Sequence, residues 1–213
     1  ELLCLLGPNG AGKSTTLDLI CGKTRATSGR IVFEGEDITG LKEYRRARRG
    51  IGRKFQVPSV FKELTVLENI EVARSHRPGI WDALRVFRTP LSGDTREILE
   101  LVGLLELVDV RAGNLSHGQT QWLEIAMLLA QKAKLILMDE PTAGMTIQET
   151  LKTAEIFNRL KGEHTLIVVE HDMQFVRQVA ERVIVMNRGS LLAEGTISQI
   201  EADPRVKAVY LGH

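Results

Sequence analysis

Short apolar runs, bounded by glycine or by polar turn residues, recur along the chain and predict β-strands. The runs span Leu2–Leu6, Arg30–Phe33, Leu135–Met138, Thr165–Val169 and Val183–Met186. Segments with helical periodicity lie between several of them, at Ser14–Ile20, Gln148–Lys161 and Met173–Ala180. Because strands alternate with helices, the pattern predicts an α/β fold with a mostly parallel sheet. Such sheets bind ligands at the carboxyl ends of their strands, so candidate chemistry is expected there.

Residues 65–132 follow a different pattern and predict an α-helical subdomain inserted into the α/β core. Their apolar positions are spaced as in helices at Val66–Ala73, Thr95–Leu107 and Thr120–Leu129, without a convincing strand. The expected domains are therefore a core of residues 1–64 and 133–213 and a helical subdomain of residues 65–132. Since Glu1 leads directly into the first apolar run, we expect N-terminal strands of the core to precede this sequence.

Composition and charge are typical of a folded protein without a bulk attraction for polyanions. Hydrophobic residues make up 43% of the 213 residues and charged residues 26%, which excludes a disordered chain. The 28 Lys and Arg residues nearly balance the 27 Asp and Glu residues, so no nucleic-acid partner is expected. The apolar runs are much shorter than the roughly 20 residues that span a bilayer, so no membrane-spanning helix is expected.

Neither the cysteines nor the arginines of the chain indicate a dedicated metal or anion site. Cys4 and Cys21 have neither the number nor the spacing of a disulfide framework or a zinc site. We expect both to be reduced thiols in the core of a cytosolic protein. A short basic cluster is expected to form a solvated helix face. Its members are Arg45, Arg46, Arg48 and Arg49.

A glycine-rich loop between the first strand and the first helix carries a strong chemical signal. It matches the pattern G-x-x-x-x-G-K-S/T, which cradles phosphates in nucleotide-binding proteins. Glycines let the backbone wrap around the β-phosphate, Lys13 reaches the β- and γ-phosphates, and the hydroxyl of Ser14 suits Mg²⁺. The sequence therefore predicts a site for a nucleoside triphosphate and Mg²⁺. The residues that hold them are Gly7, Pro8, Asn9, Gly10, Ala11, Gly12, Lys13, Ser14 and Thr15.

Two acidic residues follow the apolar run of residues 135–138, at the carboxyl end of a predicted strand. Asp139 suits direct or water-mediated coordination of Mg²⁺. Glu140 suits the polarisation of a water molecule that attacks the γ-phosphate in line. Acids that merely end a strand are common, but beside a phosphate loop they predict hydrolysis of the nucleotide.

A turn of small and polar residues precedes the predicted helix of residues 120–129 and provides a second candidate anion site. This signature turn consists of Ser116, His117, Gly118 and Gln119. Its free amides and the Ser116 hydroxyl lie at a helix N-terminus, where they suit an anion, although Ser116 also suits a plain N-cap.

The phosphate loop, the strand ending in Asp139 and Glu140, and the L-S-x-G-Q of the signature turn together resemble the nucleotide-binding subunits of ABC transporters. The resemblance covers essentially the whole chain. It implies a P-loop NTPase core of the RecA-like type, with a mostly parallel sheet and an inserted helical subdomain. It also implies ATP as the nucleotide.

The resemblance assigns roles to two further residues. Gln56 falls at the position of the family's Q-loop glutamine, which contacts Mg²⁺ and the attacking water. His171 falls at the position of its switch histidine, which holds the γ-phosphate and orders Glu140. The implied catalytic residues are therefore Glu140, His171 and Gln56, and the implied Mg²⁺ ligands are Ser14, Gln56 and Asp139.

The resemblance also implies a head-to-tail dimer with two ATP molecules at its interface. In this family the signature turn of one subunit closes over ATP held by the partner's phosphate loop. This sequence departs from the family at three points. His117 replaces the middle glycine of L-S-G-G-Q, and Thr146 stands where most relatives have an aspartate. The aromatic residue that stacks on adenine in the family would precede Glu1.

Three segments look like the branched-chain amino acid and urea importer group, and the first two look most like its urea-type ATPases. They are residues 52–61, the signature turn with residues 122–124, and the ending at residues 193–195 and 208–212. The likeness implies an ATP-hydrolysing subunit that powers solute import, peripheral on the cytoplasmic side of the inner membrane. Its implied partners are transmembrane permease subunits, a second identical or different ATPase subunit and, indirectly, a solute-binding protein. We expect Val57, Val60 and Phe61 to be partly exposed and to receive a permease helix.

Two other function classes stay open. A soluble ABC-type ATPase that acts on nucleic acid or ribosomes usually carries two cassettes or a long coiled coil, and this sequence shows neither. A small-molecule kinase would use the arginine cluster as a phosphate lid but leaves the signature turn without a role. Neighbouring genes for a solute-binding protein and two multi-span subunits would favour import.

Overall fold

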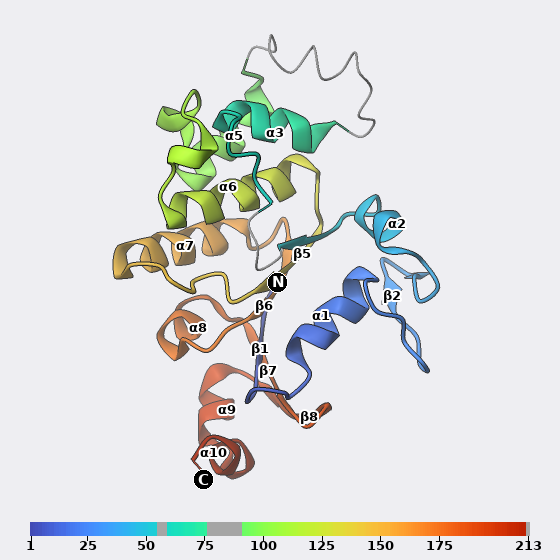
Figure 1. Ribbon diagram of the computed structural model, residues 1–213. Helices are drawn as coiled ribbons and strands as arrows, with labels where there is room; N and C mark the ends of the chain where they lie inside the picture. The colour runs from blue at the N-terminus through green and yellow to red at the C-terminus, as the bar shows by residue number, and fades with distance from the viewer. Residues whose placement is uncertain (55–58, 76–90, 212–213) are drawn as a thin grey trace. The chain divides into compact units, whose positions relative to one another are not determined.

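A computed structural model describes residues 1–54, 59–75 and 91–211, and the chain divides into two compact units (Figure 1). The core unit comprises Glu1–Arg53, Lys134–Pro141 and Leu160–His213. The helical unit comprises Lys54–Ala133 and Thr142–Arg159. The domain limits expected from the sequence, after residues 64 and 132, stay a prediction.

A six-stranded sheet, in the order β4-β5-β6-β1-β7-β8, is built from strands that the sequence predicts mainly by their apolar runs. Neighbouring strands among β5, β6, β1 and β7 run parallel, and the register places Cys4 between Val168 and Val183. Because helices cover both faces, these central strands are continuous apolar runs rather than alternating ones. Their bounds are Leu2–Leu6 for β1, Leu135–Asp139 for β5, Thr165–Val169 for β6 and Arg182–Asn187 for β7.

The edges of the sheet are formed by strands that carry weaker apolar signals. Strand β4 (Ile51–Lys54) lies at one edge, and β8 (Ser190–Gly195) lies antiparallel to β7 at the other, with an irregularity between Val185 and Met186. A separate two-stranded ribbon pairs β2 (Val32–Phe33) with β3 (Glu36–Asp37). Of the strand expected over residues 30–33, only the second half, Val32–Phe33, forms a strand.

Helices cover both faces of the sheet in the core unit. Helix α1 lies on one side of the strands, and α8 and α9 lie on the other (Figure 1). The α1 side chains Leu17 and Cys21 are buried in a cluster with Leu5 and Leu137 of the sheet, and Cys4 is buried as well, both cysteines with free thiols. The core helices are α1 (Lys13–Cys21), α2 (Glu43–Ala47), α8 (Met173–Val179), α9 (Ile197–Ala202) and α10 (Pro204–Leu211).

The helical unit is built around α6, which packs against α3 and α5. Capping boxes begin α3 at Thr65 and α6 at Ser116, which satisfies the first amides of each helix. Across the described part of the chain, no helix is long and apolar enough to span a membrane. The helices among its described residues are α3 (Val66–Arg74), α5 (Gly93–Val102), α6 (His117–Ala130) and α7 (Ile147–Leu160), with 3₁₀ turns at Leu105–Leu107 and Ala112–Asn114.

The helix expected over residues 95–107 is wrong in its second half. Helix α5 ends at Val102 because Gly103 adopts a left-handed φ of 73° and its amide bonds back to the helix carbonyls. A short 3₁₀ turn follows it. A left-handed glycine is a common helix end, and it interrupts the apolar periodicity that the sequence continues past it.

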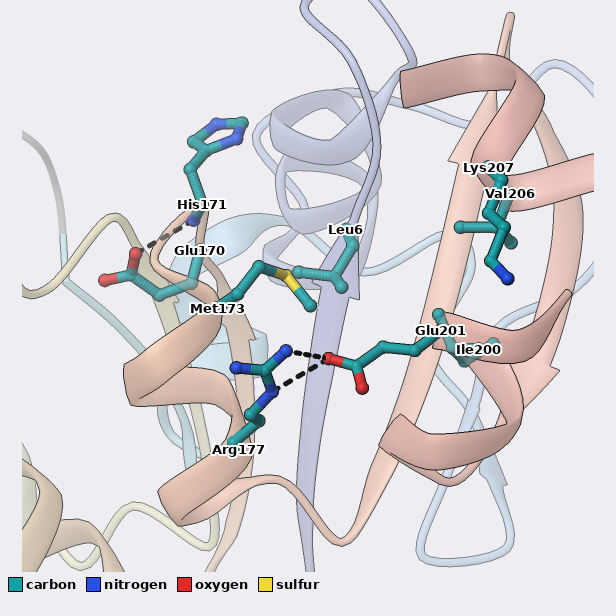
Figure 2. A pocket seen from close by; sticks show the side chains of 9 residues that line it. All are labelled: Leu6, Glu170, His171, Met173, Arg177, Ile200, Glu201, Val206 and Lys207. Carbon is teal, nitrogen blue, oxygen red and sulfur yellow. Dashed lines mark hydrogen bonds and ion pairs between the residues drawn. The ribbon is translucent and has the colours of Figure 1, made fainter. Parts of the chain in front are cut away.

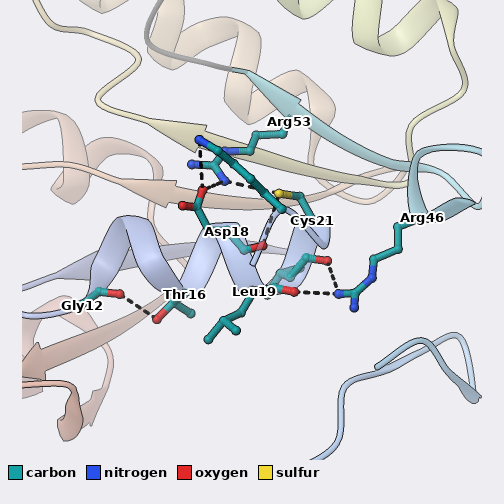
Figure 3. Close-up of polar contacts among 9 residues, drawn as sticks. Gly12, Thr16, Asp18, Leu19, Cys21, Arg46 and Arg53 are labelled. Carbon is teal, nitrogen blue, oxygen red and sulfur yellow. Dashed lines mark hydrogen bonds and ion pairs between the residues drawn. The ribbon is translucent and has the colours of Figure 1, made fainter. Parts of the chain in front are cut away.

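The arginine cluster is not uniformly solvated, so that expectation is wrong for Arg46. This side chain is 1% exposed, and its guanidinium donates to four backbone carbonyl oxygens. Figure 3 shows the bond to Leu19. Two of these carbonyl oxygens belong to the last turn of α1, and two belong to the loop before α2. Arg46 therefore caps the carboxyl end of α1. The acceptors are Leu19 (2.6 Å), Ile20 (3.0 Å), Thr39 (2.9 Å) and Leu41 (3.0 Å).

Candidate nucleotide site

The phosphate loop, Gly7–Ser14, leaves β1 and enters α1 through glycines in left-handed conformations. Gly7 has a φ of 147°, and a Cβ there would lie 2.3 Å from the carbonyl oxygen of Met186, so no side chain fits. Gly12, with a φ of 101°, immediately precedes the first residue of α1. Beside Gly10 the space is open, with no heavy atom within 4 Å of a Cβ placed there. Open space beside glycine-rich backbone at a helix N-terminus suits a phosphate group.

The ammonium of Lys13 lies over the same loop. Its Nζ donates to the carbonyl oxygens of Gly7, at 2.8 Å, and Pro8, at 3.1 Å. Burial lowers the pKa of Lys13, whereas the carboxylates of Asp139 and Glu140 raise it. Phosphate oxygens are stronger acceptors than backbone carbonyls, so this buried cation is well placed to bind them.

Glu140 and His171 come together where β5 and β6 end. The His171 Nε2 lies 3.1 Å from Oε1 of Glu140, and each side chain is a little under half exposed, at 42% and 44%. Glu140 has a left-handed φ of 49°, and its amide donates to the Val169 carbonyl at 2.9 Å. Positive φ is uncommon outside glycine and persists where the surrounding structure enforces it. The bond to β6 fixes this carboxylate at the end of the sheet.

The turn that carries His171 is itself fixed by two acidic neighbours. Glu170 is buried, and its Oε2 accepts from the amides of His171, at 3.0 Å, and Asp172, at 3.4 Å (Figure 2). Asp172 in turn accepts from the amides of Gln174 and Phe175 and caps α8. The backbone of His171 is therefore held between a strand end and a helix start.

Oxygen donors that suit Mg²⁺ flank the loop. Ser14 and Thr15 are exposed on the first turn of α1, and Asp139 is buried at the end of β5. Hydroxyl and carboxylate oxygens are the ligand types that Mg²⁺ prefers beside nucleotide phosphates. Within the described ranges, no group of three or more His, Cys, Asp and Glu side chains forms a different metal site. The residues present fit a magnesium nucleotide.

The signature turn begins α6 in the helical unit, and it combines the two roles that the sequence left open. Ser116 and Gln119 form a capping box, with the Ser116 amide donating to the Gln119 side chain at 2.9 Å. The Ser116 hydroxyl also donates to Oε1 of Glu149 at 2.9 Å, and the Gly118 amide donates to the same oxygen at 3.2 Å. The turn therefore caps a helix and binds an anion, which in this structure is a carboxylate of the chain itself.

The two residues that depart from the family pattern both have partners in the helical unit. The His117 Nε2 lies 3.0 Å from the Ala143 carbonyl oxygen and 3.3 Å from the Gln121 Nε2. Thr146 forms a capping box with Glu149 at the start of α7, and its amide and hydroxyl each lie 3.0 Å from Oε2. The departures thus connect the signature turn to residues 143–149.

The sequence also assigns roles to four residues between β4 and α3. Gln56 and Val57 lie outside the described residues, so their roles stay predictions. Val60 is half-buried, and Phe61 is 52% exposed.

The sequence pattern does not reveal one ionic contact of the core unit, between Arg53 and Asp18. Arg53 of β4 pairs with Asp18 of α1 and donates to the Cys21 sulfur at 3.3 Å (Figure 3). No local signal identifies this contact, because its partners lie more than thirty residues apart. Glu149 does have a signal, since T-x-x-E is the pattern of a capping box.

A cavity of about 610 Å³ lies beside His171 in the core unit (Figure 2). An ion pair between Arg177 and Glu201, with a shortest N···O distance of 2.6 Å, lies across it. Among the described residues, none of the phosphate loop Gly7–Ser14 lines it, although His171 does. Its lining is Leu6, Glu170, His171, Met173, Arg177, Ile200, Glu201, Val206 and Lys207.

A family model described as ABC transporter matches residues 1–143 of the chain. The chain belongs to the ATP-binding subunits of ABC transporters. This ABC ATPase is 36% identical over 222 residues to the high-affinity branched-chain amino acid transport ATP-binding protein BraF of Pseudomonas aeruginosa, covering 100% of the chain and 87% of that protein. It is 35% identical, with the same coverage, to the corresponding protein LivG of Escherichia coli K12. It is also 35% identical to the lipopolysaccharide export system ATP-binding protein LptB of Haemophilus influenzae, covering 100% of the chain and 86% of that protein.

Solved structures agree with the family. The ADP conformation of an ATP-binding cassette from an ABC transporter superimposes with a TM-score of 0.83 at 32% identity, covering 100% of this chain and 88% of that one. A dimeric post-hydrolysis cassette with bound ADP and phosphate gives 0.72 at 27% identity, covering 92% and 85%. The predicted P-loop NTPase fold is confirmed, and the chain is an ATP hydrolase of the ABC type.

Proposed function

We propose that this ABC ATPase powers the import of branched-chain amino acids across a membrane. The observation that supports the hydrolytic step is the Glu140–His171 pair beside the phosphate loop. Glu140 accepts the proton of the attacking water, and His171 orders that carboxylate and holds the γ-phosphate. Lys13 exchanges its carbonyl partners for phosphate oxygens. Mg²⁺, when held by Ser14, Asp139 and Gln56, supplies charge neutralisation at the phosphates.

The solute is proposed from relatives that themselves differ in cargo. BraF and LivG are named for branched-chain amino acids, whereas LptB, at nearly the same identity, is named for lipopolysaccharide export. Identity near 35% therefore supports the subunit class more firmly than the solute. Urea, which the sequence motifs favour, is the second candidate solute, supported by residues 52–61 and by the signature turn with residues 122–124.

The proposed assembly has two ATPase subunits and a membrane permease. The signature turn of one subunit binds the ATP on its partner's phosphate loop, and two such sites form in a head-to-tail dimer. Phe61 and Val60 supply an apolar surface beside the Gln56 segment for a permease helix. The subunit then lies peripherally on the cytoplasmic side of the inner membrane, and a solute-binding protein delivers the solute from the other side.

Reconstitution tests this function directly. The chain is assembled in proteoliposomes with the permease subunits and binding protein encoded beside its gene, and uptake of labelled leucine and labelled urea is measured with ATP inside. ATP-dependent uptake of leucine supports the proposal. If only urea is taken up with ATP, the transported solute is urea instead of branched-chain amino acids. Glu140→Gln subunits are the control, since they retain the fold but lose the proton acceptor. Uptake that does not require ATP contradicts a powering role.

A further inference from the structure

The carboxylate of Glu149 accepts hydrogen bonds from the groups of the signature turn that would bind a phosphate. Its Oε1 accepts from the Ser116 hydroxyl and the Gly118 amide. A Cβ placed on Gly118 would lie 2.5 Å from the same oxygen, so the space above the turn is filled. A phosphate oxygen has the charge and the acceptor geometry that Glu149 already supplies at this point.

The other oxygen of Glu149 has a separate role. Oε2 accepts from the amide and hydroxyl of Thr146 and completes the cap of α7. The Thr146 amide and the Ser116 hydroxyl are the main donors that lower the pKa of Glu149, so the side chain is an anion at neutral pH. The two functions of this carboxylate, capping α7 and filling the turn, are therefore divided between its two oxygens.

We propose that Glu149 is an internal occupant of the signature turn, which must withdraw before the turn binds nucleotide on a partner subunit. The inference rests on the proposed role of the turn in a dimer and adds its regulation. A turn that is free only for a fraction of the time binds its ligand with an affinity reduced by that fraction. The isolated subunit is thereby biased against closing on ATP, and whatever moves α7 relative to α6 releases that bias.

The experiment measures ATP-driven dimerisation in subunits that carry Glu140→Gln, which prevents turnover. Adding Glu149→Gln keeps an amide oxygen to cap Thr146, but leaves no anion to hold Gly118. Sedimentation with ATP over a range of protein concentrations gives the dimer dissociation constant. We expect it to fall about threefold to tenfold, because the turn no longer has an internal competitor.

Two further variants make the result specific. Glu155→Gln removes the same charge from an exposed position on α7, where the carboxylate pairs with Lys152, and should leave the dissociation constant unchanged. Glu149→Asp has a carboxylate one methylene shorter, which does not reach Gly118 from α7, and should tighten the dimer as Glu149→Gln does. It serves as the second test if the amide variant folds poorly.

The outcomes separate this inference from the function on which it rests. If the parent dimerises with ATP but neither Glu149 variant lowers the dimer dissociation constant, the inference is overturned and the proposed function is not. A gain with Glu155→Gln equal to that of Glu149→Gln also overturns it, since general charge then explains the effect. Absence of ATP-dependent dimers in every variant refutes the proposed shared site and the inference together.

Discussion

Among single residues, Glu140 has the most direct link between position and chemistry. Replacing it with Gln keeps its size and its contact with His171 but removes the group that accepts the water's proton. We expect hydrolysis to fall by about a hundredfold or more, with nucleotide affinity within a factor of about two of the parent. Single-turnover hydrolysis and equilibrium binding of a fluorescent ATP analogue measure the two effects. A variant that keeps more than a tenth of the parent rate contradicts the assignment.

The thiol of Cys4 is a second residue whose surroundings determine its reactivity. Burial, followed by the negative charge of Glu170, raises its pKa from 9.0 to about 12. At pH 8.5 the reactive thiolate is therefore less than about a thousandth of the population, and the side chain is inaccessible as well. Iodoacetamide at this pH should leave Cys4 unlabelled in the native chain and label it fully in guanidinium chloride, as followed by peptide mass spectrometry. Native labelling at the rate of a free cysteine contradicts the buried position.

Residues at the ends of parallel strands are the part of the site that the sequence predicts well. Asp139, Glu140 and His171 each follow an apolar run, and parallel strands place such ends at one edge of the sheet. Arg46 and Glu149 are different, because their importance depends on partners 5 to 33 positions away that pattern alone does not identify. In the sequence alone, Arg46 has the pattern of an exposed charged residue, and Glu149 has the pattern of a residue in the first turn of a helix.

At the scale of elements, Arg46 connects the end of α1 to the loop before α2. Truncation by Arg46→Ala leaves carbonyls of Leu19, Ile20 and Thr39 without this buried donor, and we expect the free energy of unfolding to fall by about 3 kcal/mol. Arg46→Lys should recover only part of this loss, because an ammonium does not reproduce the planar fork. Urea unfolding followed by circular dichroism measures both.

A neighbour in the same cluster provides the control for this helix cap. Arg45 is exposed and contacts Tyr44 instead of backbone carbonyls, so Arg45→Ala should change the unfolding midpoint little. Equal losses for the two alanine variants would show that the cluster acts through surface charge and not through the cap of α1.

Elements with a continuous apolar signal are predicted closely, and elements without one are not. The expected strands over residues 2–6 and 165–169 agree with β1 and β6 to the residue. Strand β4 was not expected, because Gly52 and two basic residues interrupt its short run, and its pairing depends on β5 far along the chain. Ile51, Gly52 and Lys54 of β4 are all buried, but only Ile51 carries an apolar side chain, so the burial of this strand leaves no apolar run in the sequence.

At the scale of the whole molecule, the exposed side chain of Phe61 tests the proposed permease surface. Phe61→Asp places a charge where an apolar helix would dock, so we expect loss of co-purification with the permease while ATP hydrolysis by the free subunit stays within about twofold. Leu191→Asp, at a similarly exposed apolar residue on β8, should leave assembly intact. Unfolding of the Phe61 variant, seen as loss of its circular dichroism signal, would instead favour a packing role.

The last expectation concerns the sharing of one reaction between two subunits. The phosphate loop with Glu140 belongs to the core unit, and the signature turn with its anion-binding groups belongs to the helical unit. In the proposed dimer, the partner's signature turn stabilises the transition-state charge of the γ-phosphate. A lone subunit lacks this turn, so it stabilises that charge poorly. Hydrolysis per subunit should therefore rise with protein concentration until the dimer saturates.

Complementation between two inactive variants tests that sharing most sharply. Lys13→Ala removes the cation of the phosphate loop, and Ser116→Arg blocks the signature turn, so each homodimer has no competent site. A mixed dimer has one intact site, made from the loop of the Ser116→Arg subunit and the turn of the Lys13→Ala subunit. Because random pairing makes half of the dimers mixed, an equimolar mixture should recover about a quarter of the parent activity if sites act independently. Mixtures that stay inactive, together with parent activity that does not depend on concentration, would place the whole reaction within one subunit.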